Sequence, residues 1–289
     1  MHYDTLRTEL DDGILLVTLD REQRMNAFTP RMADELEHMF RAVNADDRVA
    51  AVIVTGAGRA FCAGMELGGA GNVFGLDESL SPTLADMRNR LDDPAIQTGV
   101  RDTGGRVTLA IFDCVKPVIA AINGAAVGIG ATMTLAMDFR LATRDAKIGF
   151  VFGRLGIVPE ACSSWFLPRL VGEQLALEWT LTADILDADT ALAGGLLRSL
   201  HEDRDALLHE AKALAHRIVD GRSSVAIALT RIMMKHNPAL PHPLEAHRID
   251  SLAMFYTSTE DGREGVKAFL EKRAPSFTSK ASSTPMDIL

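Results

Sequence analysis

The chain has 289 residues, of which 47% are hydrophobic and 24% are charged. This composition is typical of a globular protein with a sizeable core, and it excludes a disordered or low-complexity chain. Lys and Arg number 30 against 39 Asp and Glu, a formal net charge of -9. Because nucleic-acid binding needs a basic surface, no nucleic-acid partner is expected.

Cysteine and histidine usage argues against disulfides and metals. Cys62, Cys114 and Cys162 are too few and too scattered for a disulfide scaffold, and no His or Cys spacing is typical of a metal site. The N-terminus carries no apolar leader, and no run of about 18 apolar residues is present. We therefore expect a cytoplasmic protein that binds no metal and has no membrane partner.

The first half of the chain alternates short apolar runs with helical stretches. Thr29 before Pro30 is a typical cap and first-turn proline, and it predicts a helix over Pro30–Val43. This alternation predicts an α/β fold. The predicted strands are Ile14–Leu19, Val49–Thr55, Pro117–Ile122 and Asp138–Thr143.

Two later regions have a different pattern. The segment Glu66–Gly105 is rich in Gly, Asp and Pro, so we expect a long mobile excursion that shapes a site, with a possible short helix at Pro82–Leu91. After Pro159 the pattern is helical almost throughout, which predicts an all-α C-terminal third.

Two glycine-containing turns are candidates for binding. Ala60–Met65 follows a predicted strand, and Asn123–Gly130 leads from a strand into a helix. Glycine lets the backbone approach a ligand, and a helix N-terminus presents free N–H groups, so two such turns could form an oxyanion hole. The alternative is two ordinary tight turns. A dinucleotide site, and with it a nicotinamide oxidoreductase, is weakly supported because Met133 stands where a third glycine is expected.

Taken together, four segments between about Leu15 and Phe277 resemble the crotonase superfamily, also called the enoyl-CoA hydratase/isomerase family. The resemblance implies an α/β spiral of ββα units over residues 1–200 that carries the acyl-CoA site. It also implies a helical region over residues 201–289 that builds trimers and caps the CoA. The four segments are Leu19–Phe28 (LDREQRMNAF), Phe61–Leu67, Lys116–Gly130 and Glu260–Arg273.

The resemblance also implies a ligand and a site. The substrate would be an acyl-CoA thioester, with CoA as part of the substrate and no further cofactor, in a homotrimer or dimer of trimers. The backbone N–H groups of Met65 and Ile129 would form the oxyanion hole. Phe269 and Lys272, from the same or a neighbouring subunit, would close over the nucleotide. The implied CoA-binding residues are Arg24, Ala27, Ala63, Gly64, Phe269 and Lys272.

The chain departs from the family at the positions that decide the reaction. Typical hydratases of the family use two glutamates, where this sequence has Thr132 and Phe152. One acid remains nearby: Glu160, in a Pro-Glu-x-x-Ser-Ser segment similar to that of the single-glutamate Δ3,Δ2-enoyl-CoA isomerases. An apolar pocket around Glu160 would raise its pKa towards neutrality. The alternative is a carboxylate at a helix start, which the helix dipole would stabilise without any function.

The resemblance therefore predicts a Δ3,Δ2-enoyl-CoA isomerase with Glu160 as the catalytic acid and base. Hydration is the first alternative, because Glu160 with a polar partner such as Ser163, Ser164 or Thr132 could hold a water. Thioester hydrolysis would use the same oxyanion hole. A non-catalytic acyl-CoA-binding protein is the alternative from another class, in which the fold is kept and the chemistry is lost.

Overall fold

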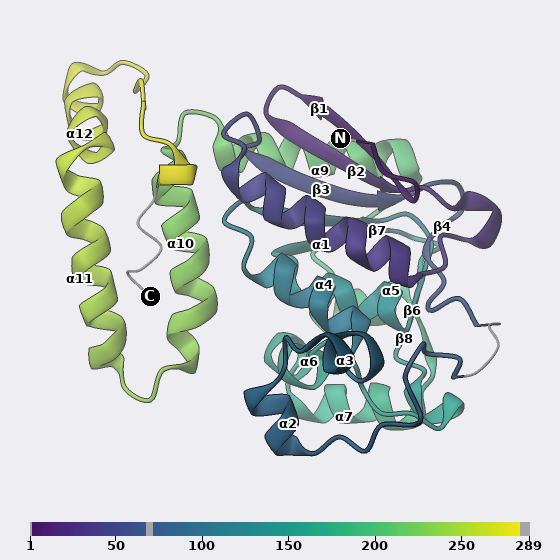
Figure 1. Cartoon of the computed structure of the whole chain (residues 1–289). Helices are drawn as coiled ribbons and strands as arrows, with labels where there is room; N and C mark the ends of the chain where they lie inside the picture. The colour runs from purple at the N-terminus through teal and green to yellow at the C-terminus, as the bar shows by residue number, and fades with distance from the viewer. Residues whose placement is uncertain (1, 68–71, 284–289) are drawn as a thin grey trace.

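A computed structural model describes residues 2–67 and 72–283, and it contains two β-sheets surrounded by helices (Figure 1). The larger sheet has six strands in the order β1-β2-β3-β5-β7-β10. β1 and β2 form an antiparallel hairpin, and every other neighbouring pair is parallel. The bounds are β1 Leu6–Asp11, β2 Ile14–Leu19, β3 Ala51–Gly56, β5 Val118–Ile122, β7 Phe139–Thr143 and β10 Ser199–His201.

All four predicted strands are confirmed to within two residues at either end. β1 was not predicted, because only Leu6 is buried and the strand has no apolar pattern. It turns into β2 through Asp12 and Gly13, both of which have positive φ. Edge strands of this kind are fixed by pairing with a neighbour rather than by their own side chains.

A second sheet of four strands, in the order β4-β6-β8-β9, lies next to the first. β4, β6 and β8 each follow a strand of the larger sheet, so the chain makes repeated β–β–helix turns around a spiral. Strands of three residues carry no hydrophobic period, and none of them was predicted. The bounds are β4 Ala60–Cys62, β6 Ala125–Val127, β8 Lys147–Gly149 and β9 Ile185–Asp187. The predicted α/β spiral with a C-terminal helical region is confirmed.

The core occupies both faces of the six-stranded sheet. Helices α1 (Pro30–Ala45) and α4 (Thr103–Phe112) pack together over one face, where Val54 and Ala120 are buried. Helix α9 (Arg204–Val219) covers the other face, where Ile53 and Ile119 are buried. This alternation has the period of two expected of a β-strand. Thr29 caps α1 through the Met32 N–H, as predicted.

The segment between β4 and α4 is more ordered than predicted over its described residues. It contains α2 (Leu84–Asn89), which starts at a capping box of Thr83 and Asp86, and α3 (Pro94–Gly99). The short helix predicted at Pro82–Leu91 corresponds to α2. Residues 68–71 of the excursion lie outside the described residues. The other short helices are η1 Glu22–Arg24, α5 Ile129–Thr132, η2 Met133–Ala136, η3 Phe152–Leu155, α6 Ser163–Val171, α7 Glu173–Thr182 and α8 Ala188–Ala193.

The last helices form an arm, residues 224–283, that stands beside the core (Figure 1). The boundary placed at residue 200 stays a prediction, although α9 lies beyond it and packs against the large sheet. In the described part of the chain, no helix is long and apolar enough to cross a membrane. The arm consists of α10 Ser224–His236, η4 Asn237–Ala239, α11 Pro243–Thr259, α12 Asp261–Glu271 and η5 Ala281–Ser283.

Candidate active site

The two glycine turns lie side by side because the strands that precede them are neighbours. β4 pairs in parallel with β6, so the turn after Cys62 and the turn after Val127 leave the small sheet at the same edge. Gly64 (φ 105°) and Gly128 (φ 53°) have the positive φ that favours glycine. Glycine adopts this backbone conformation without strain, whereas a residue with a side chain would be strained at either position.

Each turn ends on a backbone N–H that has no hydrogen-bond acceptor among the described residues. Gly64 accepts a hydrogen bond from the Phe28 N–H through its carbonyl, and Glu66 donates to the Phe28 carbonyl, which leaves the N–H of Met65 between them free. Ile129 is the first residue of α5, so its N–H has no partner within the helix. Neither N–H donates to another described backbone carbonyl. Both can therefore receive an oxygen that carries negative charge.

The first predicted CoA-binding turn lies against the turn at Met65. Ala63 donates from its N–H to the Met25 carbonyl over 3.1 Å, which joins η1 to the end of β4. Arg24 projects into solvent with 73% of its side chain exposed, and its Nε lies 4.0 Å from a carboxylate oxygen of Glu66. Ala27 follows in the same turn and is partly buried. The structure thus brings Arg24, Ala27, Ala63 and Gly64 together beside Met65.

Glu160 lies beside α5, in the loop before α6. Its Oε1 accepts a hydrogen bond of 2.5 Å from Oγ1 of Thr132, a residue of α5 that is fully buried. A Cβ atom built on Gly104 would collide with Oε2 of Glu160 and with Cδ1 of Ile129. The carboxyl group of Glu160 is therefore enclosed between α5 and the first turn of α4.

The pKa of Glu160 is raised from its ordinary value to about 8. Burial is the largest cause because it disfavours the charged carboxylate, and the negative charge of Asp102 adds to it. The hydrogen bond from Thr132 acts in the opposite direction and lowers the pKa. A carboxyl group with a pKa near neutrality can accept and donate a proton under physiological conditions.

The alternative of a dipole-stabilised Glu160 is wrong. The sequence pattern predicts helix directly after Pro159, but Ala161 and Cys162 have left-handed φ of 53° and 55°, and α6 begins at Ser163. Glu160 therefore lies outside the first turn of α6. Its pKa is raised, whereas a helix N-terminus would lower it.

The apolar shield expected from the neighbouring sequence is only partly realised. Phe150 and Phe152 are buried, and Phe150 stacks on Trp179. Val158 does not contribute to a buried pocket, because 77% of it is exposed. Trp165 packs edge-on against Phe112, with ring centroids 5.9 Å apart. Glu160 is enclosed instead by contacts distant in sequence.

The structure does not bring Phe269 and Lys272 to these turns within one chain. Both belong to the end of α12, on the arm, and Figure 1 shows α12 at the opposite end of the molecule from β4. Phe269 is 79% exposed. A contact of these residues with the site around Met65 therefore requires a second subunit.

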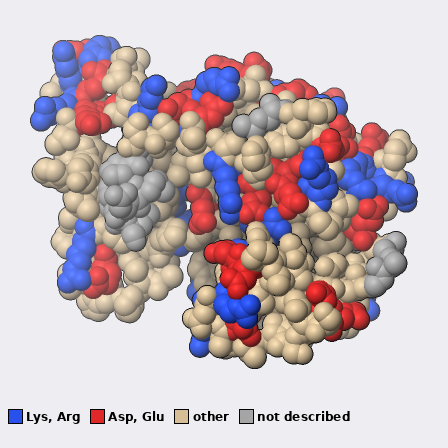
Figure 2. Space-filling view, in the orientation of Figure 1, with Lys and Arg blue, Asp and Glu red and all other residues tan. Residues whose placement is uncertain are grey.

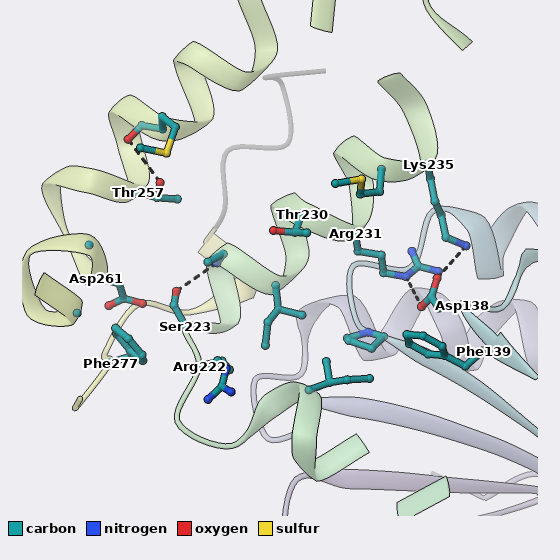
Figure 3. Close-up of a pocket in the computed structure, with 18 of the residues that line it drawn as sticks. Asp138, Phe139, Arg222, Ser223, Thr230, Arg231, Lys235, Thr257, Asp261 and Phe277 are labelled. Atoms are coloured by element: carbon teal, nitrogen blue, oxygen red, sulfur yellow. Dashed lines mark hydrogen bonds and ion pairs between the residues drawn. The ribbon is translucent and has the colours of Figure 1, made fainter. Parts of the chain in front are cut away.

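A large groove separates the arm from the core, and its lining does not include Glu160. It has a volume of about 1640 Å³ and is bordered by α6, α10, α11 and α12. At its inner end Asp138 binds Arg231 over 2.8 Å and Lys235 over 3.0 Å, which holds α10 on the core (Figure 3). This buried ion-pair cluster was not predicted, because its members are about 90 residues apart.

Sequence reasoning also missed Asp102. Its carboxylate accepts hydrogen bonds from the N–H groups of Gly104 (2.9 Å), Gly105 (3.0 Å) and Ala161 (2.6 Å). An Asp before Thr-Gly-Gly is a recognisable helix cap, which could have been found. The hydrogen bond from the Ala161 N–H to Asp102 could not have been found in the sequence, because it joins segments 59 residues apart. Among the described residues, no group of three or more His, Cys, Asp or Glu could hold a metal ion.

Comparisons of the sequence and of the structure with known proteins both identify the enoyl-CoA hydratase/isomerase family. The model of the enoyl-CoA hydratase/isomerase family matches residues 9–280. An enoyl-CoA hydratase of Alternaria alternata is 38% identical over 268 residues, which covers 92% of this chain and 83% of that protein. The 1,2-epoxyphenylacetyl-CoA isomerase of Escherichia coli is 31% identical over 274 residues, which covers 94% and 98%.

Solved structures agree with the sequence matches. The crystal structure of a probable enoyl-CoA hydratase/isomerase from Mycobacterium abscessus superposes with a TM-score of 0.79 at 29% identity, covering 96% of this chain and 99% of that one. A structure of a putative enoyl-CoA hydratase from Streptomyces coelicolor also gives a TM-score of 0.79, at 30% identity. The similarity therefore extends over the core and the arm together.

Proposed function

Because this chain belongs to the enoyl-CoA hydratase/isomerase family, we propose that it is a Δ3,Δ2-enoyl-CoA isomerase with Glu160 as its single acid and base. The family is the one that the four sequence motifs resemble. Its relatives include proteins named as hydratases and one named as an isomerase, so the reaction has to be argued from the site of this chain.

One observation supports the isomerase: of the three positions at which the family resemblance places acid–base groups, 132, 152 and 160, only position 160 carries a carboxyl group. The two positions that hold glutamates in typical hydratases are Thr132 and Phe152, both buried. A 1,3-proton shift needs one group that takes a proton from one carbon and returns it to another. Hydration also needs a group that holds and activates water.

The proposed reaction starts from a 3-enoyl-CoA whose thioester oxygen lies between the N–H groups of Met65 and Ile129. These donors stabilise the charge that develops on that oxygen, as in an oxyanion hole. Ionised Glu160 removes a proton from C2, which gives a dienolate, and then returns the proton to C4. The double bond moves from C3–C4 to C2–C3. No electrons leave the substrate, so the reaction needs no cofactor beyond the CoA that the substrate carries.

We propose that Arg24, Ala27, Ala63 and Gly64 hold the CoA and that Phe269 and Lys272 of a neighbouring subunit cap it. The arm supports a homotrimer or a dimer of trimers, because it exposes a large apolar surface and a monomer rarely does so. Six large hydrophobic residues of the arm are more than half exposed: Met234, Met254, Phe255, Val266, Phe269 and Leu270. Figure 2 shows charges of both signs interspersed over the core, while much of the arm is uncharged.

Hydration is the second candidate, and one observation favours it. The hydroxyl of Ser163 is buried and has no hydrogen-bond partner among the described residues. Its N–H donates to the Glu160 carbonyl, so the hydroxyl belongs to the same loop. A buried polar group of this kind can hold a water.

The test incubates purified protein separately with a medium-chain 3-enoyl-CoA and its 2-enoyl isomer, and follows the products by chromatography and mass. We expect the 3-enoyl substrate to become the 2-enoyl product without gain of water. Glu160→Gln should lower this rate by about 10³-fold or more. Glu173→Gln, at the exposed start of α7, is the matched control and should keep the rate.

Rapid formation of 3-hydroxyacyl-CoA from the 2-enoyl substrate would instead identify a hydratase. Binding of both thioesters without turnover, unaffected by Glu160→Gln, would identify a non-catalytic acyl-CoA-binding protein. Full isomerase activity in Glu160→Gln would refute the assignment of the base.

A further inference from the structure

The hydroxyl group of Thr132 carries one proton and lies within hydrogen-bond distance of two acceptor oxygens. Its Oγ1 lies 2.5 Å from Oε1 of Glu160 and 3.2 Å from the backbone carbonyl of Gly128. A hydroxyl group donates one hydrogen bond at a time. Which acceptor receives the proton therefore depends on the state of Glu160.

When Glu160 is ionised, the short bond to Oε1 is a charge-assisted bond that Thr132 donates. When Glu160 is protonated on Oε1, the direction reverses: Glu160 donates to Oγ1, and the Thr132 proton turns to the Gly128 carbonyl. In both cases Oε1 remains bound to the same side chain. Thr132 is fully buried, so no solvent competes for these bonds.

The second oxygen of Glu160 has no such partner. Oε2 faces Gly104, where a Cβ atom would collide with it. No hydrogen bond joins Oε2 to another described residue. The two oxygens of one carboxyl group are thus unequal, with Oε1 held by Thr132 and Oε2 free.

We propose that Thr132 is the positioning residue of the acid–base group, holding Oε1 so that Oε2 alone carries the proton between C2 and C4. This inference rests on the proposed isomerase function. In the forward step Oε2 takes the C2 proton while the C2–H electron pair passes into the dienolate. In the return step the O–H bond at Oε2 breaks as the C4–H bond forms, so no proton is gained or lost overall.

The groups around Glu160 act on its pKa from every side. Asp102 on the α4 side raises it by charge repulsion. The pKa values of Cys62 on β4 and Cys162 in the loop are raised mainly by burial, and the charge of Glu160 adds to both shifts. The positive charge of Arg101 acts in the opposite direction on the pKa of Cys162, whose net shift is upward. Thr132 is the one neighbour whose contact lowers the pKa of Glu160.

The test replaces Thr132 by Val, which keeps the shape and removes the hydroxyl, and by Ser, which restores it. Thr134→Val is the matched control, because the buried Thr134 hydroxyl donates only to the Ala131 carbonyl one turn away. The pH dependence of kcat and KM is measured with the 3-enoyl-CoA.

We expect Thr132→Val to move the acidic limb of the kcat profile upward by about one pH unit, and so to lower kcat near pH 7 by about tenfold with KM within about twofold. Thr132→Ser should restore both the limb and kcat, and Thr134→Val should leave both unchanged. An unmoved acidic limb in Thr132→Val, or the same change in Thr134→Val, would overturn the inference. If Thr132→Val does not fold, Thr132→Ala is tested against the same expectations.

A second readout separates this inference from the proposed function. The carbon-13 signal of the Glu160 carboxyl, identified by its loss in Glu160→Gln, reports the titration of Glu160 without any substrate. If the wild-type protein does not isomerise but Thr132→Val still raises the titration midpoint, the function is wrong and the contact with Thr132 stands. If the protein isomerises and the midpoint does not move, Thr132 does not position Glu160.

Discussion

The raised pKa of Glu160 makes a prediction about stability that does not depend on the reaction. In the unfolded chain the carboxyl titrates near 4.5, and in the fold near 8. The folded protein thus binds the proton more tightly. The neutral carboxyl group of Glu160 contributes its full share to the folding stability below about pH 4.5, and this contribution is lost as the pH rises towards 8.

Replacing Glu160 by Gln removes the buried charge and keeps a neutral side chain of the same shape. A gap of about 3.5 pKa units corresponds to about 5 kcal/mol at 1.36 kcal/mol per unit, and partial solvent access reduces this. The unfolding free energy of the variant minus that of the wild type should rise by about 3–4 kcal/mol as the pH rises from 5 to 9, because only the wild type loses stability when Glu160 ionises.

Urea unfolding followed by circular dichroism at several pH values measures this difference, with equal protein concentrations so that subunit association does not enter the comparison. Glu173→Gln removes an exposed carboxylate and is the matched control, for which the difference from wild type should change by less than about 1 kcal/mol over the same pH range. A difference for Glu160→Gln that stays constant within about 1 kcal/mol would refute the burial argument, because it would mean that Glu160 titrates alike in both states.

Three further predictions concern the surroundings of Glu160 and the arm. Asp102→Asn removes the charge that raises the pKa of Glu160, so the acidic limb of the rate profile should move down by about half a pH unit; an upward shift would contradict the charge argument. Gly104→Ala places a methyl group against Glu160 and should lower kcat at least about tenfold, with circular dichroism checking that the fold is kept. Asp138→Asn removes the counter-charge of Arg231 and Lys235 on α10 and should destabilise the protein by about 3–5 kcal/mol in urea unfolding. A loss below about 1 kcal/mol would mean that packing and the hydrogen bonds of these two side chains to backbone carbonyls hold α10 without the ion pairs.

Much of the fold follows from local sequence. The β2, β3 and β5 strands are buried runs rich in Val, Ile, Leu and Ala, and such short runs between turns are typical of the buried strands of a parallel sheet. The cap at Thr29 is equally local, since the contact spans three residues. The four family motifs and the absence of a carboxylate at Thr132 and Phe152 are also properties of the sequence alone. They were sufficient to identify the family and to select Glu160.

The electrostatics of the site depend on contacts that no local pattern contains. From the sequence, Glu160 could equally have been a dipole-stabilised residue with a lowered pKa. Its pKa is raised because α5 and α4 enclose it and because Asp102 lies close, and these segments are 28 and 58 residues away. Similarly, the sequence predicts that the arm is helical. It does not predict that Asp138 of the core forms ion pairs with Arg231 and Lys235 of α10, which join the arm to the core.

The sequence by itself therefore determined the strands β2, β3, β5 and β7, the helix α1, the two glycine turns and the choice of Glu160 as the candidate acid. The tertiary structure alone decided that the Met65 and Ile129 turns leave the sheet at one edge, and that Thr132 holds one oxygen of Glu160. The physical reason is that hydrophobic period and capping act over a few residues, whereas desolvation and charge repulsion depend on every group that folding brings near.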